Sequence, residues 1–127
     1  MRPVDSRRFV MKPATFNIEI DQGTLWRRTV CAYSGRSSDA PPWDMTGCQI
    51  HAQIRERAVG PLVRDITVVP TDLAKGTFEL VIDDRNRALR KFQLAWDLLI
   101  ITPDGAVNKY LEGSLTVRPT ITRTNGQ

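Results

Sequence analysis

The stretch "DMTGCQIHAQIR", residues 44–55, contains the clearest periodicity in the chain. From residue 48 the side chains alternate between two faces, Cys48, Ile50, Ala52 and Ile54 on one and Gln49, His51, Gln53 and Arg55 on the other. Strict alternation of this kind is typical of a β-strand with one buried face and one wet face. Thr46-Gly47 precedes it as a turn signal. The stretch therefore predicts one strand of a half-exposed sheet.

The same stretch holds the single histidine and one of the two cysteines of the chain. A structural zinc site needs about four ligands. Cys48 and His51 are three residues apart in a strand, so their side chains point to opposite faces. We therefore expect Cys48 to fill the core, His51 to face solvent, and no metal to bind here. Cys31 and Cys48 are predicted to be free thiols, because small disulfide-stabilised domains usually carry more cysteines.

A period of two continues through the rest of the chain and predicts about seven strands. The other six lie at about residues 14–20, 24–33, 63–70, 77–83, 93–102 and 106–123. No amphipathic helix of full length separates them, which favours an all-β fold. We expect an antiparallel β-sandwich, immunoglobulin-like, with an extended N-terminal arm; a small barrel is the alternative.

Four local features of this prediction depend on single residues. The apolar and polar faces of residues 24–33 are not cleanly separated, so we expect a bulge near Arg27-Arg28. Gly113 predicts a second bulge. Pro70 is expected to close a short edge strand. Residues 84–92 are expected to form at most one helical turn, with Asp83 or Asp84 as its cap.

Bulk properties bound the class of protein. The chain has 127 residues, 41% of them hydrophobic and 25% charged, as expected of one globular domain. We divide it into an arm (1–13), a β-sandwich domain (14–123) and a tail (124–127). No apolar run is long enough to span a bilayer, and no secretory signal precedes the domain, so we expect no membrane partner and synthesis in a cytoplasm.

The net charge of +4 comes from basic residues spread along the whole chain. Without a block of like charges, we expect a basic surface and no specific nucleic-acid partner. Turns, caps or strand faces explain the positions of the carboxylates, so none of them indicates acid–base catalysis. With a single histidine in the chain, no Ser-His-Asp spacing can be recognised. The sequence therefore predicts a protein that is not an enzyme and uses no cofactor.

Partner-binding candidates come from the arms and from one loop. The arm lacks regular periodicity and is too polar to order itself alone, which makes contact with neighbours its expected role; the alternative is that it folds back on its own domain. Trp43, in a loop with two prolines, is either a lid over one end of the core or an aromatic anchor for a partner. The candidate residues are Arg2, Arg7, Arg8, Phe9, Trp43, Arg118 and Arg123.

Four short motifs occur in a fixed order: Met45-Thr46-Gly47, Ile54-Arg55, Trp96-Asp97-Leu98 and Leu111-Glu112-Gly113. Over about residues 16–122 this order resembles small virion structural proteins of tailed bacteriophages. That family in turn resembles the immunoglobulin-like domains that attach baseplate and tail-fibre parts. Each motif also has a structural role as a turn, a core position or a loop contact, so the resemblance adds a context and no chemical site.

The resemblance implies a virion protein, assembled in the host cytoplasm in the tail, baseplate or neck. Its partners would be other virion proteins and copies of itself, contacted through arms and sheet edges. A capsid decoration protein of the same fold is an alternative. A carbohydrate-binding module is the third possibility, with Trp26, Trp43 or Trp96 as a stacking platform.

Overall fold

A computed structural model of the chain describes residues 14–34 and 39–122. Within them the chain forms eight strands and one short 3-10 helix: β1 (Ala14–Thr15), β2 (Ile18–Asp21), β3 (Leu25–Cys31), β4 (Gln49–Arg55), β5 (Leu62–Asp72), η1 (Leu73–Lys75), β6 (Thr77–Asp83), β7 (Gln93–Ile101) and β8 (Val107–Arg118). No helix among the described residues is long and apolar enough to cross a membrane. The predicted arm and tail lie outside the described residues.

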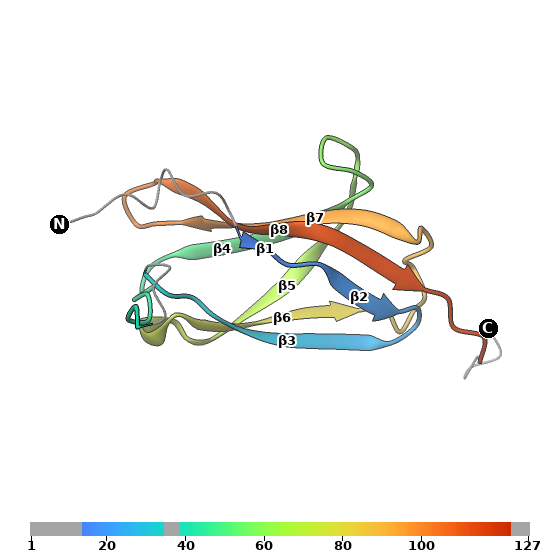
Figure 1. The fold of residues 1–127 in the computed structure, drawn as a ribbon, viewed down its shortest axis with the longest axis horizontal. Helices are drawn as coiled ribbons and strands as arrows, with labels where there is room; N and C mark the ends of the chain where they lie inside the picture. The colour runs from blue at the N-terminus through green and yellow to red at the C-terminus, as the bar shows by residue number, and fades with distance from the viewer. Residues whose placement is uncertain (1–13, 35–38, 123–127) are drawn as a thin grey trace.

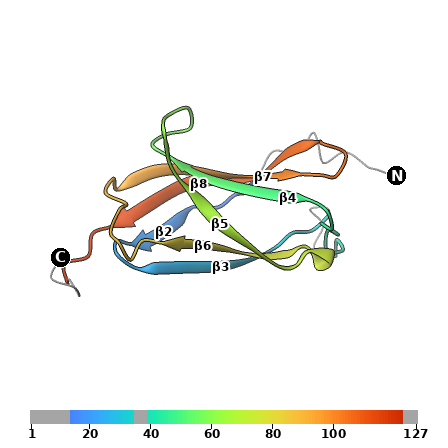
Figure 2. The same cartoon turned by 180° about the vertical axis from the view of Figure 1, so that it is seen from behind.

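The strands form two layers that share β5 (Figure 1). The larger layer has the order β1/β2, β8, β7, β4 and the first part of β5; the smaller has the second part of β5, then β6 and β3. Figure 2 shows β5 running diagonally from beside β4 to beside β6. This crossing closes one side of the sandwich and leaves β2 and β3 as the strands of the other, open side.

The strand order is that of an immunoglobulin-like sandwich. β3, β6 and β5 lie in one sheet and β4, β7 and β8 in the other, which is the Greek-key distribution of such domains. All these pairings are antiparallel, whereas β1 and β2 run parallel to β8. The predicted fold class is confirmed, and the first predicted strand is divided into β1 and β2 at Phe16-Asn17.

The core lies between the two layers. It is formed by the apolar side chains that the alternating pattern of each strand directs inward. Ala52 and Ile54 of β4 are buried, while His51 is exposed. Cys48 is half-buried and packs against the core, as predicted. Trp96 of β7 is buried, and its Nε1–H donates to the carbonyl oxygen of Phe16 (2.8 Å).

The bulge expected near Arg27-Arg28 is absent. β3 pairs with β6 from Leu25 to Cys31 without a register shift. Arg28 pairs with the buried Leu80, so it occupies an inward position of β3. The polar residue on the apolar face is accommodated because it lies at the open side, where its long side chain reaches solvent.

The bulge expected at Gly113 lies elsewhere. The β7–β8 register shifts between Leu98 and Leu99, where Tyr110 is the extra residue of β8. Gly113 is required for another reason: a Cβ there would lie 2.2 Å from the carbonyl oxygen of Phe16. The glycine lets the segment between β1 and β2 approach β8 closely enough for its carbonyl to receive the Trp96 hydrogen bond.

Two further expectations need correction. β5 extends over 11 residues, and Pro70 lies inside it, paired with Phe78. A proline is tolerated there because this part of β5 has a strand neighbour on one side only. Residues 84–92 form a turn without a helix: Arg87 has a left-handed backbone (φ 56°), and Asp84 is buried instead of capping a helix.

Candidate functional site

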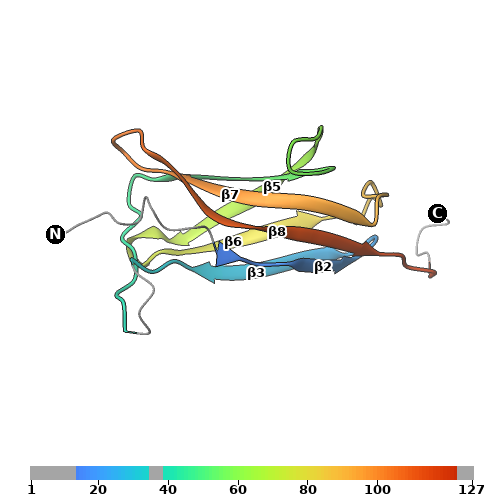
Figure 3. The ribbon, with the colours of Figure 1, turned by 45° about the horizontal axis from the view of Figure 1, so that its top comes forward.

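The open side of the sandwich lies between β2 and β3, which Figure 3 shows side by side in the two layers. Three side chains meet there. The Arg28 guanidinium carbon lies 5.1 Å from the ring centre of Phe16 and 5.9 Å from that of Trp26. Phe16 in turn packs edge-on against Trp96 (6.3 Å between ring centres). Cation–π contacts thus cover the aromatic rim of the core at this side.

β3 itself is an edge strand. Among the described residues it pairs with β6 on one side and with no strand on the other. An edge strand presents unpaired backbone N–H and C=O groups to a potential partner strand. Its outward side chains include the exposed Arg27, which makes no ion pair with any described residue. Within the part of the chain that the structure describes, both the outward backbone groups of β3 and the charge of Arg27 are therefore available for a contact.

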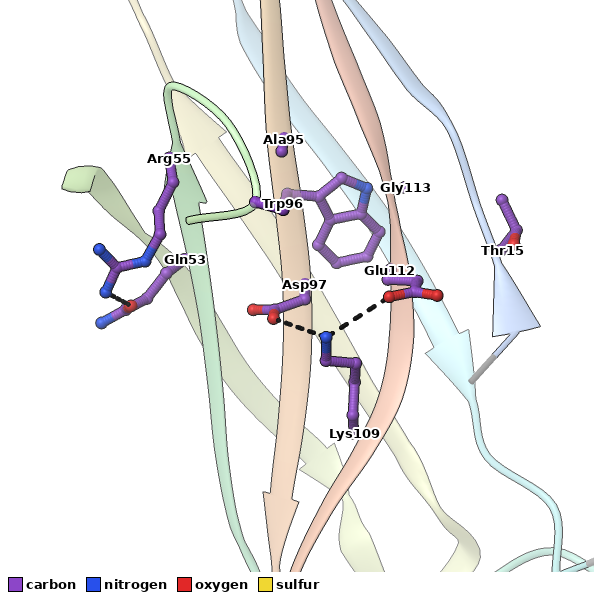
Figure 4. Close-up of a pocket in the computed structure, with 10 residues that line it drawn as sticks. Thr15, Gln53, Arg55, Ala95, Trp96, Asp97, Lys109, Glu112 and Gly113 are labelled. Atoms are coloured by element: carbon purple, nitrogen blue, oxygen red, sulfur yellow. Dashed lines mark hydrogen bonds and ion pairs between the residues drawn. The ribbon is translucent and has the colours of Figure 1, made fainter. Parts of the chain in front are cut away.

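A second candidate is a pocket of about 310 Å³ on the outer face of the larger layer (Figure 4). The pocket exists because small residues, Ala95 of β7 and Gly113 of β8, form part of its lining. Arg55 of β4 and Lys109 of β8 contribute charge to its walls. Its size is at the lower limit for a small-molecule site.

The charges of this pocket are already paired with each other. Lys109 Nζ lies 3.5 Å from Asp97 Oδ2 and 3.4 Å from Glu112 Oε1, so both carboxylates form ion pairs with this lysine. Arg55 donates to the Gln53 side chain (2.8 Å) and to the carbonyl oxygen of Gly60 (3.1 Å). A ligand would have to displace these bonds, which makes the pocket a weaker candidate than the β3 edge.

A buried polar cluster fixes the end of the sandwich where β2 turns into β3. Asp84 is fully buried, and its carboxylate accepts the backbone N–H groups of Gly23 (2.9 Å) and Leu89 (2.8 Å). Arg87 donates to the Gln22 side chain (3.0 Å) and to the carbonyl oxygen of Thr120 (3.0 Å). These bonds position the β2–β3 turn, and with it the start of the open edge.

Aromatic side chains gather at the opposite end. The Trp43 ring is half-buried and lies 6.0 Å from that of Tyr110. The backbone N–H of Tyr33 donates to the Tyr110 hydroxyl (3.3 Å), and burial raises the pKa of Tyr110. Trp43 therefore packs as a lid against the core, and this end offers no exposed indole.

The rings proposed for sugar stacking are all covered to some degree. Trp96 is buried, and Trp26 and Trp43 are half-buried, the first near the Arg28 guanidinium. A carbohydrate module needs a rigid ring with an exposed face. This arrangement disfavours the third alternative given by the sequence.

The two predicted partner-binding residues that the structure describes, Trp43 and Arg118, lie at opposite ends of the sandwich. Arg118 is exposed at the end of β8, where it pairs with Asp21 (2.9 Å) and Glu19 (3.5 Å) of β2. Trp43 lies at the other end of the sandwich. The remaining candidates, Arg2, Arg7, Arg8, Phe9 and Arg123, lie outside the described residues. The structure thus leaves their role as a prediction.

Sequence reasoning did not identify the β3 edge. The available signal was the adjacent pair Arg27-Arg28 inside a strand, which was interpreted as a bulge. The alternative was an edge position, where an inward arginine can reach solvent at the side of the sheet. No group of three or more histidine, cysteine, aspartate and glutamate side chains in the described part of the chain could hold a metal ion. Cys31 and Cys48 are both free thiols.

No known sequence family matches this chain, and no curated protein matches it. Solved structures similar to it include CopC from Methylosinus trichosporium OB3b, at 13% identity over 88% of this chain and 89% of that one, with a TM-score of 0.43. The Ig1-2 module of the Drosophila receptor protein tyrosine phosphatase DLAR has 16% identity over 91% of this chain and 50% of that one (TM-score 0.43). Murine CRIg has 9% identity over 83% and 92% (TM-score 0.40). The assignment of the fold rests on the strand order above, and these similarities add no functional argument.

Proposed function

We propose that this chain is a non-enzymatic structural protein of a tailed-bacteriophage virion. It would assemble in multiple copies in the tail, baseplate or neck, with other virion proteins as partners. The observation that carries the proposal is the open β3 edge, whose backbone and Arg27 have no partner strand or ion pair among the described residues. The order of motifs from Met45 to Gly113, which resembles virion proteins, supplies the context.

The structural arrangement supports an attachment role over a catalytic one. The polar side chains form bonds that fix turns, such as the Asp84 cluster, or ion pairs on an outer face, such as Lys109 with Asp97 and Glu112. The arm precedes β1, which forms the margin of the larger layer.

The test is incorporation into particles. The full chain and a variant lacking residues 1–12 would each carry a small epitope tag and be supplied during infection. We expect the full chain to appear in purified particles, and the truncated chain to remain a folded monomer in the lysate. Circular dichroism and sedimentation of the truncated protein control for its folding.

Particle imaging separates the proposed locations. Antibody or gold labelling at one vertex or along the tail supports the tail, baseplate or neck. Label spread over the head would support the capsid decoration alternative instead. Absence of the full chain from every particle fraction would refute a virion role altogether.

A further inference from the structure

We propose that the open edge of β3 binds an acidic, extended segment of another protein, added as one more strand of the smaller sheet. The inference rests on the proposed function and deepens it, because it names the edge and the chemistry of the partner. The occupant is a strand-forming segment rich in glutamate or aspartate. Main-chain hydrogen bonds would supply affinity, and contacts with alternate side chains would supply specificity.

The two edges of the smaller sheet differ in how they are protected. The outer edge of β5 contains Pro70, and its register with β6 shifts between Pro70 and Asp72. A proline and an irregularity are two devices by which proteins prevent strand addition. β3 contains neither over its seven residues, and its register with β6 is regular. One edge is therefore blocked and the other is competent for pairing.

The positive charge of Arg27 determines which kind of strand could be added beside β3. Arg27 pairs with Val81 of β6, so no carboxylate stands opposite it. The nearby Asp83 is already occupied by Arg85, with oxygen and nitrogen 2.7 Å apart. On the other side of Arg27 is the place that an added strand would fill. Cross-strand pairs of opposite charge stabilise a sheet and like charges destabilise it, so that strand should carry carboxylates.

The same rule disfavours segments of this chain as occupants. Residues 1–13 contain four basic side chains and one acidic one. The edge of a second copy would bring Arg27 and Arg28 close to the same residues of the first. A short acidic strand is available in β2, but its Glu19 and Asp21 already pair with Arg118. The electrostatics therefore indicate a different protein as the partner.

The experiment uses the full chain and defined peptides. The probe is a fluorescein-labelled peptide of about ten residues that alternates glutamate with valine, long enough to span an edge strand. Fluorescence anisotropy measures its binding. One control peptide replaces glutamate with lysine. A second keeps the sequence but is N-methylated at alternate residues, which removes the hydrogen-bond donors of one edge and leaves the charges. We expect binding of the probe and loss of binding with both controls.

Protein variants locate the contact. Arg27→Glu should weaken binding about ten-fold, because it converts an attractive cross-strand pair into a repulsive one. Arg57→Glu makes the same change of net charge at an exposed residue in the connection between β4 and β5, beside the larger layer, and should change binding less than about two-fold. Amide hydrogen exchange of the complex should show new protection in β3, at alternate residues.

Four results would overturn the proposal. Equal binding of the N-methylated peptide would show ionic attraction without strand addition. Equal effects of the two arginine variants would place the contact elsewhere. Protection, in the protein alone, of the alternate β3 amides that do not bond to β6, together with a dimer in sedimentation, would show that a second copy occupies the edge. A chain that enters particles but ignores the peptide refutes this inference alone, whereas a chain that binds the peptide and stays out of particles refutes the virion role.

Discussion

Asp84→Ala should be among the most destabilising substitutions in the molecule that leave its apolar core intact. The Asp84 carboxylate is fully buried and accepts two backbone N–H groups, those of Gly23 (2.9 Å) and Leu89 (2.8 Å). Alanine leaves both donors without an acceptor inside the protein. Each buried unsatisfied donor costs about 1–3 kcal/mol. For the two donors together we therefore expect a loss of about 2–6 kcal/mol in the free energy of unfolding, out of a typical total of about 5–15 kcal/mol.

The adjacent residue provides a matched control. Asp83 is exposed, and its carboxylate pairs with Arg85 in solvent. Asp83→Ala should shift the urea midpoint far less than Asp84→Ala, because an exposed ion pair contributes little to stability. Asp84→Asn should fall between the two, since its amide keeps one acceptor oxygen but turns an NH₂ towards a backbone donor.

The assay is equilibrium urea unfolding followed by tryptophan fluorescence, with the slope m compared among the variants. An unchanged slope with a lower midpoint shows a change of stability and not of the denatured state. A loss below about 1 kcal/mol for Asp84→Ala would refute the reasoning, because it would mean that water satisfies both donors without cost. Equal losses for the alanine variants of Asp83 and Asp84 would refute it as well.

Three further predictions address single positions. Gly113→Ala should lose about 1–3 kcal/mol of stability in the same urea assay, because its Cβ would lie 2.2 Å from the Phe16 carbonyl oxygen; a wild-type midpoint would contradict the close approach. Hydrogen bonds from Arg85 lower the pKa of Asp83 to about 2 from an ordinary 3.8. Its small contribution to stability is therefore present above about pH 4 and lost as the pH falls towards 2, and carboxyl NMR titration should find the midpoint near the lower value. Burial raises the pKa of Cys48 and Cys31 is exposed, so a thiol reagent at pH 8 should modify Cys31 first, with the sites identified by mass spectrometry.

Much of the fold follows from the order of residues along each strand. The alternation from Cys48 to Arg55 defined a strand and its buried face, because successive side chains of a strand must point to opposite sides. Thr46-Gly47 predicts a turn, and Gly47 has the positive φ (81°) that favours glycine. Local sequence was sufficient for these features since each depends on the residue itself or its immediate neighbours.

The errors of prediction share a different cause. The sequence predicts a bulge near Arg28, another at Gly113, and a helix cap at Asp84, yet each residue is explained by a group distant in sequence: the Phe16 ring, the Phe16 carbonyl, and the N–H of Gly23. Periodicity contains no information about which segments meet across the two layers.

The sequence by itself determined the strands, their inward faces and the absence of a catalytic motif, since these depend on periodicity and residue chemistry. Only the tertiary structure decided which strand is left at an edge. That outcome depends on β5 crossing between the layers, which closes one side of the sandwich and opens the side of β2 and β3. In the sequence, nothing distinguishes Arg27 from the other arginines. It becomes a candidate contact in the structure because, among the described residues, β3 has a neighbouring strand only on the side of β6.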